Sequence, residues 1–278
     1  MVTGGYAGVG YELVKIFYQK NATVYVAGRS KEKADKAIAS IKEAFPSSKG
    51  RLEFLSVDFS DLSTIKPAAE TFMAKGTKDA HGHELQMGTN ALDAYLLSEL
   101  LLPISRQTVA KASAGSVRVT FAASIATYIA PPGGVEFTAD GSPRDFPDQN
   151  QNYAQSKTAC VFLGSEFAKR HGKGGIISLS WNPGNLESEL HRHMPAIVDW
   201  VIWLLLQYPA RYGAYTELYA PCSPDVTESH NGAFVAPWGR FYDVRKDVTA
   251  ALKNGSEGGT GQAEKFWQWC EKESAAFK

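Results

Sequence analysis

Apolar residues follow two periodicities along the chain, and together they predict an α/β fold. Continuous β-prone runs at residues 22–27, 52–57 and 176–180 suit strands buried in a parallel sheet. Between such runs apolar residues recur at helical spacing, as at Val9 and Leu13. Strands that alternate with helices are typical of a doubly wound parallel sheet with helices on both faces. The same patterns predict helices over 30–44, 62–75, 84–102 and a segment that starts near 153, and strands over 117–121 and 232–236.

The alternation has one gap. A strand of about 5–6 residues and its loops should separate the helix over 62–75 from the helix over 84–102. Residues 76–83 are polar or small and show no strand pattern, and only residues 1–3 precede the first turn. We therefore predict a sheet whose first strand is truncated and whose fourth strand is missing.

The length fits one large domain or two small ones, and no repeat or linker-like stretch divides the chain, so we expect a single domain over residues 1–278. Lysine plus arginine equals aspartate plus glutamate at 29 each, so no basic field attracts nucleic acid. The three cysteines form no C-x-x-C pair and suggest reduced, buried thiols in a cytoplasmic protein without a signal peptide. The apolar run over 196–206 is shorter than the ~20 residues that span a bilayer, and fits a core helix or a substrate lid. A homo-oligomer is compatible with these features.

A glycine-rich turn follows the first apolar residues. Gly4, Gly8 and Gly10 stand where a strand turns into a helix, an arrangement that presents backbone N–H groups to a pyrophosphate. We expect Gly4 to permit the tight turn, Gly8 the approach of the phosphates, and Gly10 the packing of helix on sheet. The spacing differs from G-x-G-x-x-G, so a plain strand-to-helix turn is the alternative.

The strand over 22–27 ends in Gly28 and Arg29. A site for NAD needs a carboxylate near this point to bind the ribose hydroxyls, whereas an arginine suits the 2′-phosphate of NADP. A solvated arginine at a strand end is the alternative. Asp58, after the next strand, lies where an adenine amino group would be met.

Tyr153 and Lys157 are the strongest candidates for chemistry. Residues four apart on a helix share one face and lie about 6 Å apart along the axis. A phenol alone keeps its proton until pH ~10, and a lysine cation close by favours the phenolate. Ser124 at a strand end and the long loop over 125–152 precede this pair. Two histidine pairs, His81 with His83 and His191 with His193, lack further ligands and indicate exposed side chains rather than a metal site.

In this order, Thr3-Gly4-x-x-x-Gly8-x-Gly10, Asp58, Asn90, Ser124, Tyr153-x-x-x-Lys157 and Pro183-Gly184 resemble the short-chain dehydrogenase/reductase family over nearly the whole chain. Residues 84–90 and 213–217 look closest to its retinol-dehydrogenase-like branch, whose fungal members often act in secondary metabolism.

The resemblance implies a role for each residue. Tyr153 would protonate a carbonyl oxygen that Ser124 holds, and Lys157 would bind the nicotinamide ribose and favour the phenolate. Asn90 would position a water that links the lysine to solvent. Pro183 and Ser188 would lie on the cofactor, with Ser188 in place of the family's usual threonine, and residues 185–222 would form a helical segment beside the substrate.

The implied activity is the NADP(H)-dependent interconversion of a hydroxyl and a carbonyl group on a lipophilic small molecule. The family's Asn-Asn-Ala-Gly motif, which should precede Asn90, has no counterpart here. A degenerate member with little or no catalysis is therefore the alternative, and a lyase or epimerase on the same scaffold is a third possibility.

Overall fold

The computed structural model describes residues 2–56, 78–79, 81–186 and 208–278. The chain divides into two compact units, residues 1–58 with 183–218 and residues 59–182 with 219–278. Each unit has an apolar core of its own. The expectation of a single domain over residues 1–278 stays a prediction.

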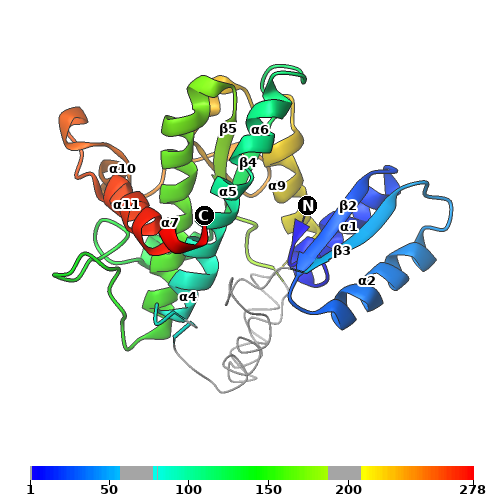
Figure 1. Ribbon diagram of the computed structural model, residues 1–278, viewed down its shortest axis with the longest axis horizontal. Coiled ribbons are helices and arrows are strands. Elements are labelled where there is room, and N and C mark those ends of the chain that lie inside the picture. The colour runs from blue at the N-terminus through cyan, green and yellow to red at the C-terminus, as the bar shows by residue number, and fades with distance from the viewer. Residues whose placement is uncertain (1, 57–77, 80, 187–207) are drawn as a thin grey trace. The chain divides into compact units, whose positions relative to one another are not determined.

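The first unit contains a three-stranded parallel sheet in the order β1-β2-β3 (Figure 1). Its strands are β1 (Val2–Thr3), β2 (Thr23–Gly28) and β3 (Arg51–Ser56), and Val26 pairs with both Val2 and Phe54. The connecting helices are α1 (Gly8–Gln19) and α2 (Lys31–Ala44). Both crossovers run in the same direction, and right-handed crossovers of this kind place both helices on one face of the sheet. Val24 and Val26 are accordingly buried, whereas Tyr25 is 41% exposed. Strand β2 therefore buries one of its faces, and the prediction that both faces are buried was wrong.

Local signals set the bounds of α2 close to their predicted positions. The Ser30 side chain caps the helix by accepting a hydrogen bond from the Lys33 amide at 3.3 Å. Ala34 and Ile41 face the core. Ion pairs four residues apart, such as Lys31 with Asp35, cover the exposed side.

The second unit contains a four-stranded sheet in the order β4-β5-β6-β7. Strands β4 (Arg118–Ala122), β5 (Ile177–Trp181) and β6 (Phe234–Ala236) are parallel, and β7 (Arg240–Phe241) returns antiparallel. The sequence did not predict β7. Its helices are α4 (Leu85–Met87), α5 (Asp93–Leu100), α6 (Leu102–Val109), α7 (Gln149–His171), α10 (Lys246–Leu252) and α11 (Gln262–Ser274), with α9 (Ala210–Cys222) divided between the units. Shorter helical turns are η1 (Gly88–Leu92), η2 (Ile125–Ile129), η3 (Gly172–Gly174), η5 (Glu228–His230), η6 (Gly255–Glu257) and η7 (Ala275–Phe277).

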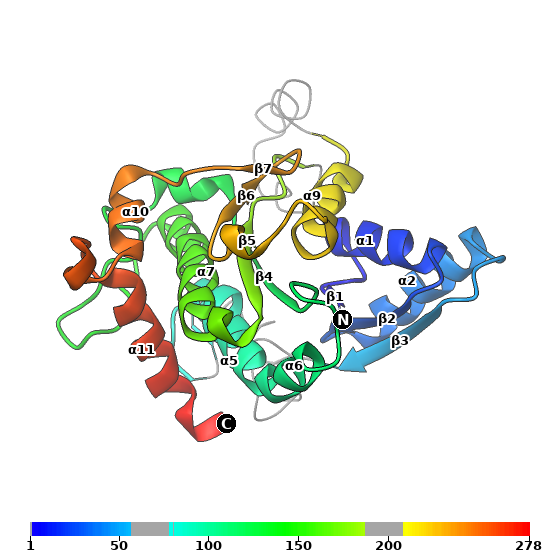
Figure 2. The ribbon, with the colours of Figure 1, turned by 90° about the horizontal axis from the view of Figure 1, so that it is seen from above.

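Both faces of β5 are covered. Ile177, Leu179 and Trp181 form a small core with Ala220 and Val226 on one face. Long helix α7 packs against the sheet (Figure 2), where an added Cβ at Gly164 would lie 3.1 Å from the backbone of β5. Glycine at this position therefore permits the close approach of helix and strand.

The aromatic side chains of α11 enter the main core of the second unit. Phe266, Trp267 and Trp269 are buried, as the expectation of an apolar packing site required. The Trp267 ring meets the fully buried Tyr95 ring edge-on at 4.7 Å between centroids. In this way α11 is joined to α5.

The region of the predicted gap differs from expectation where it is described. The helix predicted over 84–102 is divided into α4, the π-helical turn η1 and α5. Lys78 and Glu84 form an isolated antiparallel β-bridge, and residues 81–83 turn just before Glu84. The helix predicted over 62–75 and the apolar run over 196–206 lie outside the described residues. Of the stretch 76–83, residues 78–79 and 81–83 are described, and they form a turn and one isolated bridge rather than a strand.

Candidate active site

The first three turns of α7 carry Tyr153 and Lys157 on one face. The Lys157 ammonium lies 5.8 Å from the centroid of the Tyr153 ring. It also donates a 3.1 Å hydrogen bond to the carbonyl of Ala122, the last residue of β4. The helix thus holds the cation beside the phenol, as the four-residue spacing predicts.

Ser124 lies two residues beyond the end of β4. The Ala123 amide still bonds to the Trp181 carbonyl at 2.8 Å, so the sheet fixes the chain up to this point. Ser124 then caps η2, and its Oγ accepts a hydrogen bond from the Ala126 amide at 3.2 Å. A hydroxyl that accepts one bond still has its own proton to donate, and the Ser124 side chain is only partly buried.

Asn90 lies in the π-helical turn η1, a form of helix that is frequent at functional sites. Its Nδ2 donates to the Ser156 Oγ at 2.9 Å, and that hydroxyl donates to the Tyr153 carbonyl at 2.9 Å. The Asn90 carbonyl in turn accepts from the Cys160 thiol at 3.3 Å. Burial raises the pKa of Cys160 and keeps its proton in place, although Lys157 opposes the shift.

The predicted catalytic residues therefore occur together in the second unit. Asn90 is linked to Tyr153 through Ser156, and Lys157 is linked to the strand that leads to Ser124. Sequence reasoning missed Ser156. The sequence feature that could have indicated it is a small polar residue directly before Lys157, on a helix whose later part is largely apolar.

The long loop after Ser124 is built against α7. Gln155 is fully buried; its Oε1 accepts from the Glu136 amide at 2.9 Å and its Nε2 donates to the Arg144 carbonyl at 2.8 Å. Asn152, also fully buried, makes bonds of 2.8 and 2.9 Å to the two backbone groups of Phe146. The loop is thus an ordered surface beside the candidate catalytic residues.

In the first unit, the glycine turn has the backbone that the sequence predicts. Gly4 and Gly8 adopt left-handed φ values of 64° and 52°. An added Cβ on Gly8 would have no atom of the described residues within 4 Å, whereas one on Gly10 would lie 2.7 Å from the Gly4 carbonyl oxygen. Gly10 therefore keeps the start of α1 close to the turn, and Gly8 leaves open space at the helix N-terminus.

The other predicted cofactor residues are placed in part. Arg29 is exposed directly after β2. Pro183 and Gly184 follow β5, with Gly184 at a φ of 92°, and Pro183 packs close to Gly213 of α9. Asp58 and Ser188 lie outside the described residues.

Two predictions about side-chain exposure were wrong. His83 is partly buried, because its ring packs edge-on against Trp269 of α11. Its Nδ1 lies 2.8 Å from Asp79 and its Nε2 3.3 Å from Glu273. Cys222 is exposed, because it lies at the end of α9. His81 is exposed as expected, and His191 and His193 lie outside the described residues. Among the described residues, no three His, Cys, Asp or Glu side chains gather in a metal-binding arrangement. Within the same residues, no helix combines the length and apolarity needed to span a bilayer.

Solved structures with the same fold agree with this arrangement of helices and parallel strands. An NADPH-bound carbonyl reductase from chicken fatty liver matches with a TM-score of 0.58 at 16% identity, over 87% of this chain and 96% of its own. An NADPH-bound short-chain oxidoreductase of Pseudomonas aeruginosa matches with a TM-score of 0.59, also at 16% identity, over 85% of this chain and 93% of its own. The fold is thus α/β and Rossmann-like.

Sequence comparison defines the family. The model of the short chain dehydrogenase family matches residues 1–78. A short-chain dehydrogenase/reductase of Phomopsis amygdali is 38% identical over 98% of this chain and 88% of its own length. One of Neocamarosporium betae is 36% identical over 100% of this chain and 86% of its own. The chain belongs to the short-chain dehydrogenase/reductase family.

Proposed function

We propose that this protein is an NADP(H)-dependent oxidoreductase that interconverts a hydroxyl and a carbonyl group on a lipophilic small molecule. The observation that carries the proposal is the Tyr153–Lys157 pair, with the ammonium held 5.8 Å from the phenol ring by the end of β4. The fungal relatives suggest a place in secondary-metabolite biosynthesis. That role, a cytoplasmic location and the retinol-dehydrogenase-like branch stay part of the proposal.

The side chains of α7 and η2 suit the acid–base half of such a reaction. The Tyr153 hydroxyl would give its proton to the substrate oxygen, while the Ser124 hydroxyl donates a hydrogen bond to the same oxygen. Lys157 would bind the nicotinamide ribose and favour the phenolate that forms. Ser156 holds Asn90, which would position the water that returns a proton to this network. The cofactor, when bound, supplies the hydride.

The glycine turn and Arg29 suit the dinucleotide. The N-terminus of α1, with open space above Gly8, would accept the pyrophosphate. Arg29 would pair with the 2′-phosphate, and Pro183 would contact the nicotinamide end. Asp58 and Ser188 stay proposed contacts to adenine and to the carboxamide. The NADPH found in the two structural relatives supports this choice of cofactor.

The test is NADPH oxidation with a panel of ketones and aldehydes of graded size. We expect activity to rise with hydrophobic size, because Ile125, Tyr128 and Ile129 expose apolar surface directly after Ser124. Tyr153→Phe keeps the ring and removes the transferable proton, so turnover should fall ~10²–10⁴-fold while NADPH still binds. Undiminished turnover in this variant, or a preference for small polar sugars, would contradict the proposal.

A degenerate member with little catalysis is the second candidate. The alignment with the Phomopsis relative runs over 298 positions, more than the 278 residues of this chain, so that relative has internal residues that this chain lacks. This difference in length supports a shortened central sheet.

The direct experiment compares this chain with one that carries a strand plus Asn-Asn-Ala-Gly turn inserted between residues 75 and 84. If the sheet is incomplete, each buried backbone group left unpaired costs ~1–3 kcal/mol, out of a total stability of ~5–15 kcal/mol. The restored chain should then melt higher and turn over NADPH faster. Equal melting temperature and turnover would exclude the degenerate reading.

A further inference from the structure

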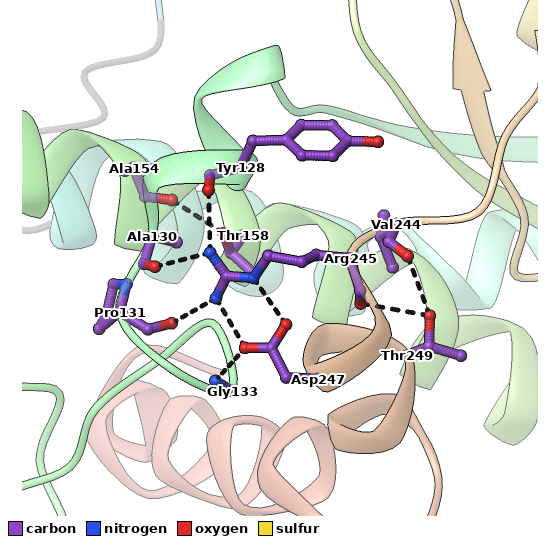
Figure 3. A network of polar contacts seen from close by, with 10 residues as sticks. All are labelled: Tyr128, Ala130, Pro131, Gly133, Ala154, Thr158, Val244, Arg245, Asp247 and Thr249. Atoms are coloured by element: carbon purple, nitrogen blue, oxygen red, sulfur yellow. Dashed lines mark hydrogen bonds and ion pairs between the residues drawn. The ribbon is translucent and has the colours of Figure 1, made fainter.

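The Arg245 side chain donates all of its N–H groups to the backbone of residues 128–131 and to Asp247 in the helix that follows it. It immediately precedes α10. Its Nη1 donates to the Tyr128 and Ala130 carbonyls, and its Nη2 to the Pro131 carbonyl, each at 2.9 Å (Figure 3). Nε and Nη2 also donate to the two carboxylate oxygens of Asp247 at 2.6 and 2.7 Å. A guanidinium has five N–H donors, so all five are engaged.

Asp247 extends the same contact to the next turn of the loop. Its Oδ2 accepts a second hydrogen bond from the Gly133 amide at 2.7 Å. The hydrogen bond from Arg245 holds the pKa of Asp247 well below its usual range, although partial burial opposes the shift. The carboxylate therefore stays charged and keeps both partners at neutral pH.

The opposite side of this stretch is held by α7. Gln151 of α7 donates to the Ile129 carbonyl at 3.3 Å. Within the loop itself, the Gly134 amide donates to the Pro131 carbonyl at 2.8 Å. The four successive carbonyls of residues 128–131 thus all have a donor from the protein. An exposed loop normally leaves such groups to water, so this backbone is held unusually firmly.

The side chains on this firm backbone are apolar and exposed. Ile125, Tyr128 and Ile129 are 51%, 40% and 58% exposed, directly after Ser124. We call these three residues the apolar rim. Tyr242, three residues before Arg245, holds the Tyr128 ring at 6.4 Å between centroids. Burial, and then a hydrogen bond to Tyr242, raises the pKa of Tyr128 to about 12.

We propose that Arg245 and Tyr242 are positioning residues that set substrate specificity, because they fix the apolar rim beside Ser124 before the substrate arrives. This inference rests on the proposed function and adds residues remote in sequence from the catalytic set. Because the rim is ordered before the substrate binds, no binding free energy is lost in ordering it. The gain applies to a bulky apolar substrate that covers the rim, and not to a small one that reaches only Ser124 and Tyr153.

Kinetics with two substrates test the inference. Arg245→Lys keeps the charge but has no planar fork to reach three carbonyls and a carboxylate. Tyr242→Ala removes the ring that lies against Tyr128, at 6.4 Å between centroids. In both variants we expect KM for a bulky apolar ketone to rise ~10- to 100-fold. KM for a small ketone and both kcat values should change less than about threefold.

Arg118→Ala is the matched control. That guanidinium also donates to backbone carbonyls in the second unit, but they lie away from the apolar rim, at Gly115, Ala220, Ser223 and Val226. Its loss should lower the melting temperature without changing the ratio of the two KM values. An equal rise of both KM values in Arg245→Lys, or the same change of ratio in Arg118→Ala, would overturn the specificity role.

Amide hydrogen exchange gives a readout independent of activity. Exchange at residues 126–134 should be faster in Arg245→Lys than in the wild type and unchanged in Arg118→Ala. Unchanged exchange in Arg245→Lys would overturn the positioning role while leaving the proposed function intact. A wild-type chain that reduces no ketone would instead refute the proposed function, and the specificity role with it.

Discussion

Replacement of Gly8 by alanine would strain the backbone of the glycine turn and also fill the proposed pyrophosphate site. The same replacement at a control glycine separates these two effects. Gly8 has a left-handed φ of 52°, and within the part of the chain that the structure describes an added Cβ would meet no atom within 4 Å. The only intrinsic cost is the left-handed backbone, which disfavours alanine by about 1–2 kcal/mol. The methyl group would, however, occupy the open space at the N-terminus of α1, where the pyrophosphate is expected.

A second glycine has the same local geometry without the proposed role. Gly258 has a φ of 76° and open space around its added Cβ, and it lies at the end of η6. Gly258→Ala should therefore lose the same ~1–2 kcal/mol of stability as Gly8→Ala. Gly10→Ala differs from both, because its Cβ would lie 2.7 Å from the Gly4 oxygen. Overpacking against backbone costs about 1–3 kcal/mol.

The assay pairs thermal unfolding with titration of NADPH by fluorescence. Each charge-assisted hydrogen bond from backbone N–H to phosphate contributes about 1.5–3 kcal/mol, and 1.4 kcal/mol is tenfold in affinity. Loss of one or two such bonds should weaken NADPH binding by about 100-fold in Gly8→Ala and leave it unchanged in Gly258→Ala. NADPH affinity within about threefold of the wild type in Gly8→Ala would refute the placement of the pyrophosphate at this turn.

Three further predictions concern single contacts. Arg29→Ala should weaken NADPH binding ~10- to 100-fold and NADH binding little, because only NADPH has a 2′-phosphate; fluorescence titration of both cofactors checks this, and equal losses contradict it. Ser156→Ala leaves Asn90 Nδ2 without its 2.9 Å acceptor. The variant should therefore lose ~1–3 kcal/mol of stability and most of its turnover. Ser156→Thr, which keeps the hydroxyl, should recover part of both. The hydrogen bond that the His83 ring donates to Asp79 raises the pKa of His83, so this contact stabilises the fold fully below pH ~6.5 and is lost as pH rises through the higher folded value. The melting temperature should show this fall in the wild type and not in His83→Gln.

Local patterns predicted much of the fold because each depends on residues close in sequence. The cap at Ser30, the buried face of α2 and the four-residue spacing of Tyr153 and Lys157 are all properties of a single helix. Glycines that need a positive φ were recognisable for the same reason, since Gly4 and Gly8 lie in one turn. Such features follow from short-range geometry.

Features that depend on distant partners were not predictable in this way. Arg245 contacts the Tyr128 carbonyl across 117 positions, and Ser156 meets Asn90 across 66. The division of the helix at η1 places Asn90 against α7, which no periodicity along residues 84–102 reveals. His83 was misjudged because its partner Glu273 lies 190 positions away.

The first three turns of α7 show why these distant contacts converge on the candidate active site. A helix that is buried all round must provide a partner for each polar side chain it carries, and residues 154–156 are almost completely buried. Each polar residue here holds a different segment: Asn152 holds the end of the long loop, Gln155 its middle, Ser156 the η1 turn and Lys157 the end of β4. Tyr153, the proposed proton donor, stands among these four anchors. The polar side chains that interrupt the amphipathic pattern of this stretch therefore position the Tyr153 ring.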